Sequence, residues 1–419
     1  MTHSTSADIA VIGAGAAGLF AAIHAGRAGA RVIALDGART LGAKILVAGG
    51  GRCNVTHHAV SERDYCGSTL PAIRNVLRRF PVEETVAFFR ARGVELKRED
   101  TGKLFPVSDS AKTVLRALLT AAEEAGVEIV FPRKVRSLRR DGHGWELTHE
   151  GGGVRAARVI LAAGGQSLPK SGSDGSGMAL ARSAGLRVTE RVFPALVPLT
   201  LPPDHWLCGL SGIATPARLS VHGPSGKTIA STAGPVLMTH FGLSGPAVLD
   251  ISRRLLDARL DDAGATLRVA LVPGADAAAL DAALAGLGPA AVGSLLKSHG
   301  LAERLSIAAC AQAGLTVEAT GSSLRKEARK ALVRVLTALE VPVIGARGWN
   351  YAEVTAGGVP LSELHLKTME ARPAPGLHLC GEVCDVDGRI GGFNFQWAWA
   401  SGFVAGTSAA AAAGAGTDG

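Results

Sequence analysis

The chain opens with alternating apolar and polar segments. Residues 8–12 form a short apolar run that predicts a buried strand, and residues 19–29 are rich in helix formers and end at a glycine. A second apolar run at 31–36 ends with an acidic residue, Asp36. Short apolar runs separated by a helical stretch are typical of a β-α-β unit in a parallel sheet. The pattern therefore predicts an α/β fold at the start of the chain.

The next segments continue this mixed character. Two amphipathic helices are expected within 69–92, on either side of Pro81, and another helix at 111–126. Residues 128–165 have β character and end in a hydrophobic strand at 159–165. This order, a β-α-β unit followed by an insertion, a β-meander and a final buried strand, predicts one cofactor-binding domain.

A change in character marks a second domain. From residue 193 the segments predict strands with turns at Pro and Gly, and 247–340 is rich in Ala and Leu and predicts helices. After residue 343 the earlier character returns. We therefore expect a discontinuous first domain, 1–192 with 344–419, and an inserted domain, 193–343, that is β-rich over 193–250 and helical over 251–343. The Ala/Gly tail from 408 is expected to be a frayed helix end.

Composition narrows the class of protein. Of 419 residues, 47% are hydrophobic and 19% are charged, which excludes an intrinsically disordered chain. Glycine supplies 54 residues, nearly twice the usual ~7%. The glycines lack the three-residue period of collagen, so their surplus points to places where the backbone turns tightly or approaches a ligand.

The charge balance leaves several kinds of partner open. The net charge is +8, and residues 74–140 hold 15 Lys and Arg against 9 Asp and Glu, a net of +6. Solvated helix faces with salt-bridge partners are the first interpretation, and an anionic cofactor or substrate is the second. Nucleic acid comes third, because no aromatic residues interleave with the basic ones.

Cysteine usage and apolar runs bear on the compartment. The six cysteines are scattered, with no CxxC pair and no zinc spacing, which favours a reducing compartment, free thiols and no metal site. The long uncharged runs are each interrupted by Gly or Pro and carry polar residues, and the first has no basic segment before it. We expect a cytoplasmic protein without membrane segments.

A glycine-rich turn joins the first predicted strand to the first helix. Gly13, Gly15 and Gly18 form a GxGxxG motif, and Asp36 follows Gly13 by 23 residues at the end of the second strand. The first glycine permits the tight turn, the second lets backbone approach a pyrophosphate, and the third lets the helix pack closely. The acid accepts hydrogen bonds from ribose hydroxyls, so the segment predicts a dinucleotide site.

A second glycine-rich segment spans residues 41–54. Three successive glycines, 49–51, precede Arg52, Cys53 and Asn54, and make a loop whose backbone can touch a flat ligand. Lys44 and Arg52 can balance the charge of a phosphate or a flavin. A purely structural loop is the alternative. Because Cys53 has no partner thiol nearby in sequence, we expect it to serve packing or backbone geometry.

The C-terminal part supplies a third motif. A predicted strand within 376–388 leads into Gly381-Glu382 and an acidic loop, and a helix is expected to begin near Gly392. Flavin-dependent oxidoreductases of the glutathione-reductase type pair a first GxGxxG with such a segment. In that layout the first motif holds the ADP half of FAD, and the second places an acid on the ribityl chain and a helix N-terminus at the flavin pyrimidine edge.

More narrowly, the chain resembles the BaiN/YhiN-like flavoprotein family of FAD- and NAD(P)-dependent oxidoreductases, which includes aminoacetone oxidase-like enzymes. The matching blocks include AVIGAGAAGL at 10–19, GAKILVAGGGRCN at 42–54, VTAGGVPLSE at 354–363 and CGEVCDVDGRIGGFNFQWAWASGFVAG at 380–406. The resemblance implies an FAD-binding Rossmann domain of the glutathione-reductase type, interrupted by an inserted β-rich and helical domain. Asp36 stands where the family usually has Glu. The cofactor-binding residues implied by this layout and resemblance are Gly13, Gly15, Ala16, Ala17, Gly18, Asp36, Lys44, Gly50, Gly51, Arg52, Cys53, Asn54, Val135, Ala163, Gly164, Gly381, Glu382, Asp385, Gly391, Gly392, Phe393 and Asn394.

These observations predict an FAD-dependent oxidoreductase. Such an enzyme moves a hydride between a small-molecule substrate and flavin N5, and exchanges electrons with O2 or NAD(P)H. The sequence has one clear dinucleotide fingerprint, so NAD(P)H is expected to dock only transiently. His240, in the inserted domain, is a candidate proton donor, although a surface or core histidine is the alternative.

Two other functions stay open at this point. One is an FAD-dependent RNA-modification protein, which the basic stretch 74–140 would serve, and the other is a flavin-binding sensor without turnover. A small-molecule substrate is the expected partner, and neither nucleic acid nor a membrane is expected. The sequence does not assign the oligomeric state.

Overall fold

The computed structural model describes residues 4–142 and 144–414. Clustering of contacts splits the chain into two compact units, Met1–Pro194 with Glu353–Gly419, and Ala195–Ala352. The sequence placed 344–352 in the first domain, whereas the structure places them in the second unit. The reason is a strand pairing: β18 (Gly345–Ala346) joins β12 (Leu199–Thr200) in the sheet of the second unit.

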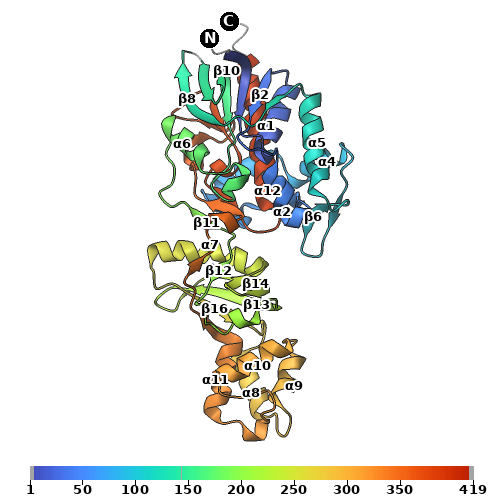
Figure 1. The fold of residues 1–419 in the computed structure, drawn as a ribbon, viewed down its shortest axis with the longest axis vertical. Helices are drawn as coiled ribbons and strands as arrows, with labels where there is room; N and C mark the ends of the chain where they lie inside the picture. Colours follow the sequence, from blue (N-terminus) through green and yellow to red (C-terminus); the bar gives the residue numbers. More distant parts are fainter. Residues whose placement is uncertain (1–3, 143, 415–419) are drawn as a thin grey trace. The chain divides into compact units, whose positions relative to one another are not determined.

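A parallel sheet forms the centre of the first unit (Figure 1). Strand β1 (Ser4–Ile12) runs parallel to β10 (Gly152–Leu161) on one side and to β2 (Val32–Leu35) on the other. Ile9, Ala10 and Val11 are fully buried, as expected for a strand covered on both faces. The strands follow the order β20 (Leu364–His365), β21 (Glu370–Ala371), β22 (Leu377–Leu379), β10, β1, β2, β7 (Glu128–Val130).

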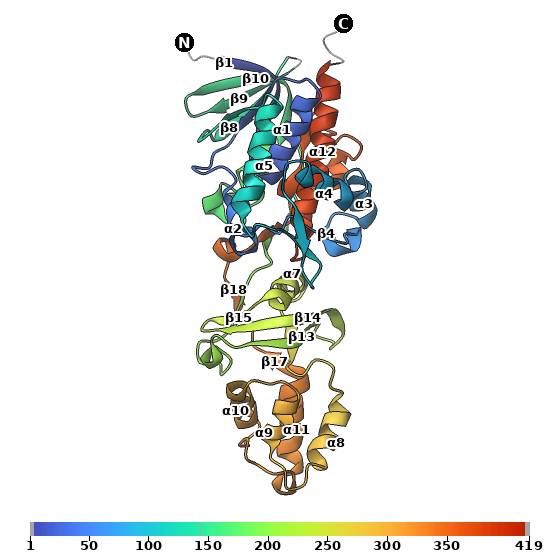
Figure 2. The ribbon, with the colours of Figure 1, turned by 90° about the vertical axis from the view of Figure 1, so that its right-hand side faces the viewer.

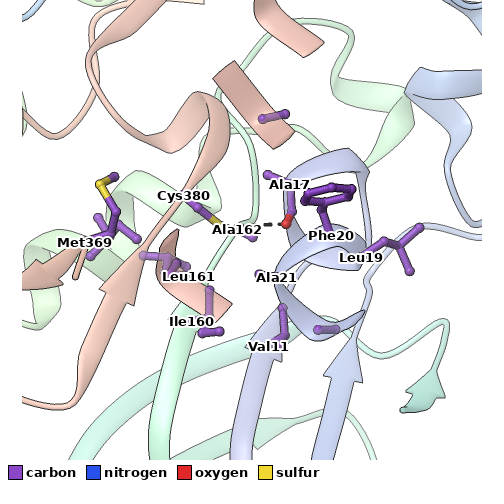
Figure 3. Packing of buried hydrophobic residues seen from close by; sticks show 14 of the residues in the cluster. Val11, Ala17, Leu19, Phe20, Ala21, Ile160, Leu161, Ala162, Met369 and Cys380 are labelled. Atoms are coloured by element: carbon purple, nitrogen blue, oxygen red, sulfur yellow. Dashed lines mark hydrogen bonds between the residues drawn. The ribbon is translucent and has the colours of Figure 1, made fainter. Parts of the chain in front are cut away.

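Helices α1 (Ala16–Arg27) and α12 (Phe393–Gly414) pack side by side on one face of this sheet (Figure 2). Their close approach requires glycine, since a Cβ on Gly406 would lie 2.2 Å from the carbonyl oxygen of Ala21. Figure 3 shows the apolar contacts beneath them, with the Cys380 thiol 3.8 Å from the Ala17 carbonyl. Small residues therefore bring the first and last helices of the chain together.

The other expected elements of the first unit are present. Two helices flank Pro81, and α5 covers most of 111–126. A meander of β8 and β9 leads into the first half of β10, and α6 packs against β8. One small sheet has the strand order β3-β6-β5, and another pairs β23 with β4. The bounds are α3 (Leu70–Leu77), α4 (Val82–Arg90), α5 (Ala111–Glu124), α6 (Ser176–Ser183), β3 (Thr56–His57), β4 (Tyr65–Gly67), β5 (Leu96–Arg98), β6 (Lys103–Pro106), β8 (Val135–Asp141), β9 (Gly144–His149) and β23 (Val386–Gly388).

Two expectations for the first unit were wrong. The loop expected over 41–54 contains α2 (Ala43–Gly51), which is helical at its start and broken from Ala48, where ψ is 141° and two left-handed glycines follow. The tail from 408 continues α12 as far as Gly414, and Ala409 and Ala410 are buried, because their small side chains permit close packing. Residues 415–419 lie outside the described part.

An antiparallel sheet dominates the second unit, in the order β17 (Leu339–Val341), β16 (Thr266–Ala270), β13 (Ala214–His222), β14 (Thr228–Thr239), β15 (Gly242–Ser244), β12, β18. Strand β16 was missed in the part expected to be helical. It alternates buried Leu267 and Val269 with half-buried neighbours and pairs with β13 and β17, a partnership that local composition does not reveal.

Helices complete the second unit. Helix α7 packs on β13 and β14, and α8 to α11 form a helical part with its own apolar contacts. Within residues 4–142 and 144–414, no helix has the length and apolar character that crossing a bilayer requires. The helices are α7 (Pro246–Asp261), α8 (Ala277–Ala285), α9 (Val292–Ser298), α10 (Glu303–Gln312) and α11 (Lys326–Ala338).

Candidate functional site

The turn between β1 and α1 uses its three glycines in different ways. Gly13 has a φ of 99°, and a Cβ there would lie 2.5 Å from the Ala162 carbonyl oxygen. A Cβ on Gly18 would lie 1.8 Å from the carbonyl oxygen of Gly13. A Cβ on Gly15 would meet no atom of the described residues within 4 Å. Gly13 and Gly18 therefore serve the fold of the turn, and Gly15 faces space that is open to a ligand.

The N-terminus of α1 opens beside Gly15. This residue is the N-cap and has no side chain to cap the helix. The first backbone bond of the helix runs from the Leu19 N–H to the Gly15 carbonyl oxygen, which leaves the N–H groups of Ala16 and Ala17 without an acceptor among the described residues. Open N–H groups and the positive end of the helix dipole make an anion site.

Asp36 ties the second strand to this turn. Its carboxylate accepts hydrogen bonds from the Ala14 N–H at 2.6 Å and the Ala38 N–H at 2.7 Å. The Asp36 carbonyl oxygen also accepts from the Arg133 N–H. Strand β8 begins two residues later at Val135, which is 4% exposed. The structure thus brings Asp36 and the start of β8 into one region, and the cofactor-binding roles of Asp36 and Val135 stay predictions.

A polar network lies at the end of β22 and involves segments far apart in sequence. The Lys44 ammonium contacts Glu382 Oε2 at 2.5 Å and Ser167 Oγ at 2.5 Å. Glu382 Oε1 accepts from the Ser167 hydroxyl at 2.7 Å and from the Thr355 N–H at 2.9 Å. The side chains of Lys44 and Glu382 are 29% and 19% exposed, so water still screens the pair.

Ser167 and Thr355 were not among the predicted site residues. The Thr355 hydroxyl also accepts the N–H groups of Gln166 and Ser167, which fixes the loop after β10. The block VTAGGVPLSE includes Thr355, but only the fold shows that Ser167 and Thr355 both reach Glu382.

The glycine loop of α2 has left-handed backbone at four of its residues. Gly49, Gly50, Gly51 and Cys53 all have φ between 59° and 86°. A Cβ on Gly50 would meet no described atom within 4 Å, so this backbone, like that of Gly15, faces open space. The Cys53 thiol is fully buried, and burial raises its pKa to about 12, which keeps it protonated. That protonation state agrees with a packing role.

Arg52, which was expected to balance the charge of a phosphate or a flavin, is paired with carboxylates of the protein. Its guanidinium binds Glu99 Oε1 at 2.7 Å, lies 3.7 Å from Asp109 Oδ1 and stacks on the Phe105 ring at 4.0 Å. These contacts hold the loop to the β5–β6 hairpin. Arg52 is therefore a residue that shapes the loop, because its charge is already matched by two carboxylates.

The start of α12 completes the arrangement. Gly391 and Gly392 have φ of 126° and 94°, and a Cβ on Gly392 would lie 2.6 Å from the backbone of Thr56. The helix begins at Phe393, and the Gln396 N–H donates to the Gly392 carbonyl oxygen at 3.0 Å. Asn394 closes a ring with Gly388, since its Oδ1 accepts from the Gly388 N–H at 2.8 Å and its Nδ2 donates to the Gly388 carbonyl at 2.9 Å. The Asn394 amide is thus engaged by the protein.

The remaining predicted residues lie in the same unit. Gly381 packs on α1, where a Cβ would lie 2.6 Å from that of Ala17, and its N–H donates to the Ser401 hydroxyl. Asp385 is buried. Ala163 and Gly164 follow β10 after one intervening residue, Ala162, beside the Gly13 turn.

Several buried polar atoms fit a large polar ligand. Among the described residues, Asn54 Oδ1 and Ser173 Oγ have no hydrogen-bond partner, although both atoms are buried. Ser173 lies against Gly164 and Asn54 follows the glycine loop. Buried polar atoms without partners are rare in native proteins and indicate a missing ligand or water. Together with the open backbone at Gly15 and Gly50, they fit a dinucleotide laid along this unit.

His240 belongs to the second unit, where it lies exposed in the turn between β14 and β15. Its ring contacts that of Phe241, with 5.1 Å between the centroids. The predicted catalytic role therefore stays a prediction. In the first unit burial raises the pKa of the Cys380 and Cys384 thiols as well, which argues against thiolate chemistry there.

Comparison with known proteins adds the family context. The profile described as the HI0933-like protein Rossmann domain matches residues 7–408. A 3-dehydro-bile acid delta(4,6)-reductase of Clostridium scindens is 34% identical, over 96% of this chain and 98% of its own. A ribosomal RNA dihydrouridine synthase of Escherichia coli is 35% identical, over 94% of this chain and 96% of its own. Among solved structures, a 3-ketosteroid-Δ4-(5α)-dehydrogenase of Rhodococcus jostii has a similar fold, with a TM-score of 0.50, 17% identity and 98% of each chain covered.

Proposed function

The chain belongs to the HI0933-like family of FAD-binding flavoproteins and is a flavin-dependent oxidoreductase, and from this premise we propose that it reduces a carbon–carbon double bond conjugated to a carbonyl group. The names of the two relatives support this reaction class. A delta(4,6)-reductase of a 3-dehydro-bile acid saturates a double bond in conjugation with a ketone. A dihydrouridine synthase saturates the ring double bond of uracil, which is conjugated to a carbonyl.

The cofactor has a defined place in this proposal. FAD, when bound, supplies the hydride at N5. The N–H groups of Ala16 and Ala17 would bind its pyrophosphate, and the free lone pairs of Asp36 would accept from its ribose hydroxyls. Glu382 would accept from the ribityl chain and Lys44 would hold that carboxylate in place.

The start of α12 supports a bound flavin in either direction of electron flow, and the observation that carries the reductive direction is the similarity to the two named relatives. The helix begins at Phe393 after two left-handed glycines and has no acidic residue in its first turn. Its positive end stabilises negative charge next to it, which favours an electron-rich, reduced cofactor. We propose that NADH or NADPH delivers the electrons by transient docking, because the sequence has one dinucleotide fingerprint.

We propose a small molecule as the substrate. The basic stretch 74–140, which would serve an RNA substrate, uses part of its charge in ion pairs within the protein. Arg74, Lys97, Lys134, Arg136 and Arg139 each contact a carboxylate. An RNA substrate is the second candidate, favoured by the 35% identity to the Escherichia coli relative over 94% of this chain.

Anaerobic reduction tests the proposal. The purified yellow protein is mixed with NADH or NADPH without oxygen, and the ~450 nm flavin band is followed. A 3-oxo bile acid with a 4,6-diene is then added, or ribosomal RNA transcribed in vitro. The expected result is bleaching by one nicotinamide, return of the band on substrate addition, and a product heavier by two hydrogens in mass spectrometry.

Three outcomes would contradict parts of this proposal. Bleaching followed by recovery only after oxygen is admitted would indicate an oxidase. Failure of both nicotinamides and of a panel of amines to bleach the band would favour a sensor without turnover. A product from the RNA arm alone would replace the small molecule by the second candidate.

A further inference from the structure

One arginine of the second unit lacks the partners that its neighbours have. Arg347 is half-buried and follows β18, where its backbone N–H donates to the Pro198 carbonyl oxygen at 3.0 Å. Across the described residues, its guanidinium has no carboxylate within ion-pair distance and no oxygen that accepts from its N–H groups. A half-buried guanidinium whose five N–H donors are not used by the protein can offer them to solvent or to a bound anion.

The other half-buried arginines of this unit are satisfied. Arg253 binds Asp257 at 2.6 Å, and Arg329 binds Asp281 at 2.9 Å. Arg259 donates to the carbonyl oxygens of Ala265 and Val343. The unit therefore pairs its arginines where it encloses them, and Arg347 departs from that pattern.

Two aromatic rings hold the Arg347 side chain. Its guanidinium carbon lies 3.6 Å from the centroid of the Tyr351 ring and 4.3 Å from that of Phe241. Ring contacts fix the plane of a guanidinium but leave its N–H edge free for oxygen acceptors. Tyr351 is 48% exposed, so the cluster is open to solvent. It is a preformed fork of donors with apolar surface beside it.

The cluster is built from separate segments of chain. Phe241 occupies the turn between β14 and β15, and the Phe241 carbonyl oxygen accepts a hydrogen bond from the Leu201 N–H. Tyr351 ends the short helix Trp349–Tyr351. The backbone of each residue is anchored independently, so the rings stay in place without a ligand.

We propose that Arg347, oriented by Phe241 and Tyr351, binds an oxyanion of the substrate, either a carboxylate or a phosphate. The planar fork matches two oxygens of such a group with charge-assisted hydrogen bonds. The inference rests on the proposed function for the assignment of that ligand as substrate. The exposed imidazole of His240, next to Phe241, is a further donor beside it.

Binding to the FAD-loaded protein tests the inference separately from turnover. Calorimetry would compare wild type with Arg347→Ala, Arg347→Lys and the control Arg218→Ala, an exposed arginine of β13. The probes are a 3-oxo bile acid with a 4,6-diene, its uncharged methyl ester, and a twelve-residue oligouridylate. FAD stoichiometry, measured from absorbance, reports that every variant is folded and loaded.

The expected result is a loss of roughly 10- to 100-fold in affinity for a charged probe in Arg347→Ala, because a hydrogen bond to a charged group is lost. Arg347→Lys should keep part of the affinity that Arg347→Ala loses. The control Arg218→Ala should bind every probe as well as wild type. Loss for the acid but not the ester identifies a carboxylate, and loss for the oligouridylate identifies a phosphate.

Two outcomes overturn the inference. One is equal binding of every probe by wild type and Arg347→Ala. The other is binding of neither charged probe by wild type at millimolar concentration. Arg347-dependent binding without double-bond reduction would refute the proposed function but leave the oxyanion site standing.

Discussion

The glycines of the first turn allow a sharp test of the cofactor site. A Cβ at Gly15 would touch no described atom within 4 Å, and the backbone there, with φ of −78° and ψ of −166°, suits any residue. Gly15→Val should therefore leave the protein itself nearly as stable, with a cost of about 1 kcal/mol or less for the changed N-cap. The added methyl groups fill the space in front of the Ala16 and Ala17 N–H groups, so the variant should lose FAD.

The size of the loss follows from the number of bonds. Two hydrogen bonds from these N–H groups to a charged pyrophosphate contribute about 3–6 kcal/mol. Their removal weakens FAD binding by roughly 10² to 10⁴-fold. The measurement is a titration of the apoprotein with FAD, followed by quenching of flavin fluorescence, beside urea unfolding of the apoprotein.

Gly18→Ala is the matched control. Its Cβ would lie 1.8 Å from the Gly13 carbonyl oxygen, so it should destabilise the apoprotein itself by about 3 kcal/mol or more. A Gly15→Val protein that stays yellow at full stoichiometry would refute the phosphate-site assignment. A Gly15→Val apoprotein as unstable as Gly18→Ala would show that the space is not open.

Three further predictions concern stability and the polar network. Burial lowers the pKa of His24 from 6.5 to about 4, so the unfolded state binds the extra proton and stability falls by about 3 kcal/mol as the pH drops from 6.5 to 4. His24→Leu should flatten this pH dependence in urea midpoints measured across that range, and an unchanged slope would contradict the prediction. Gly406→Ala should lower Tm, with a cost of about 1–3 kcal/mol, because its Cβ meets the Ala21 carbonyl at 2.2 Å, whereas Gly414→Ala, with no described atom within 4 Å, should not. Glu382→Gln leaves Lys44 without its counter-ion in a partly exposed site and should weaken FAD binding by roughly tenfold, about 1–2 kcal/mol; an unchanged FAD titration would exclude Glu382 from the cofactor site.

The sequence predicted most of what local patterns encode. The strand, glycine turn, helix and second strand at 8–36 appear as expected, because apolar runs and glycines act over a few residues. The division into two parts followed from the change in composition at 193. Strand β16 was missed since its partners, β13 and β17, lie far away in sequence.

The site was predicted less completely than the fold. The sequence singled out Lys44 and Glu382, but the residues that connect them, Ser167 and Thr355, are recognisable only after folding. Arg52 was expected to balance cofactor charge, and in the structure its guanidinium contacts the carboxylates of Glu99 and Asp109. A side chain's partner is set by tertiary packing, which motif spacing does not report.

The contact between the first and last helices has a consequence for biosynthesis. Helix α1 follows the first strand, but the helix that covers it, α12, is translated only after the whole second unit. The second unit, Ala195–Ala352, is complete on the ribosome before Glu353 is added, and domains generally fold as units during synthesis. The cofactor unit therefore closes only when α12 has emerged, so a truncated chain that lacks α12 is expected to expose the apolar face of α1 to cellular proteases.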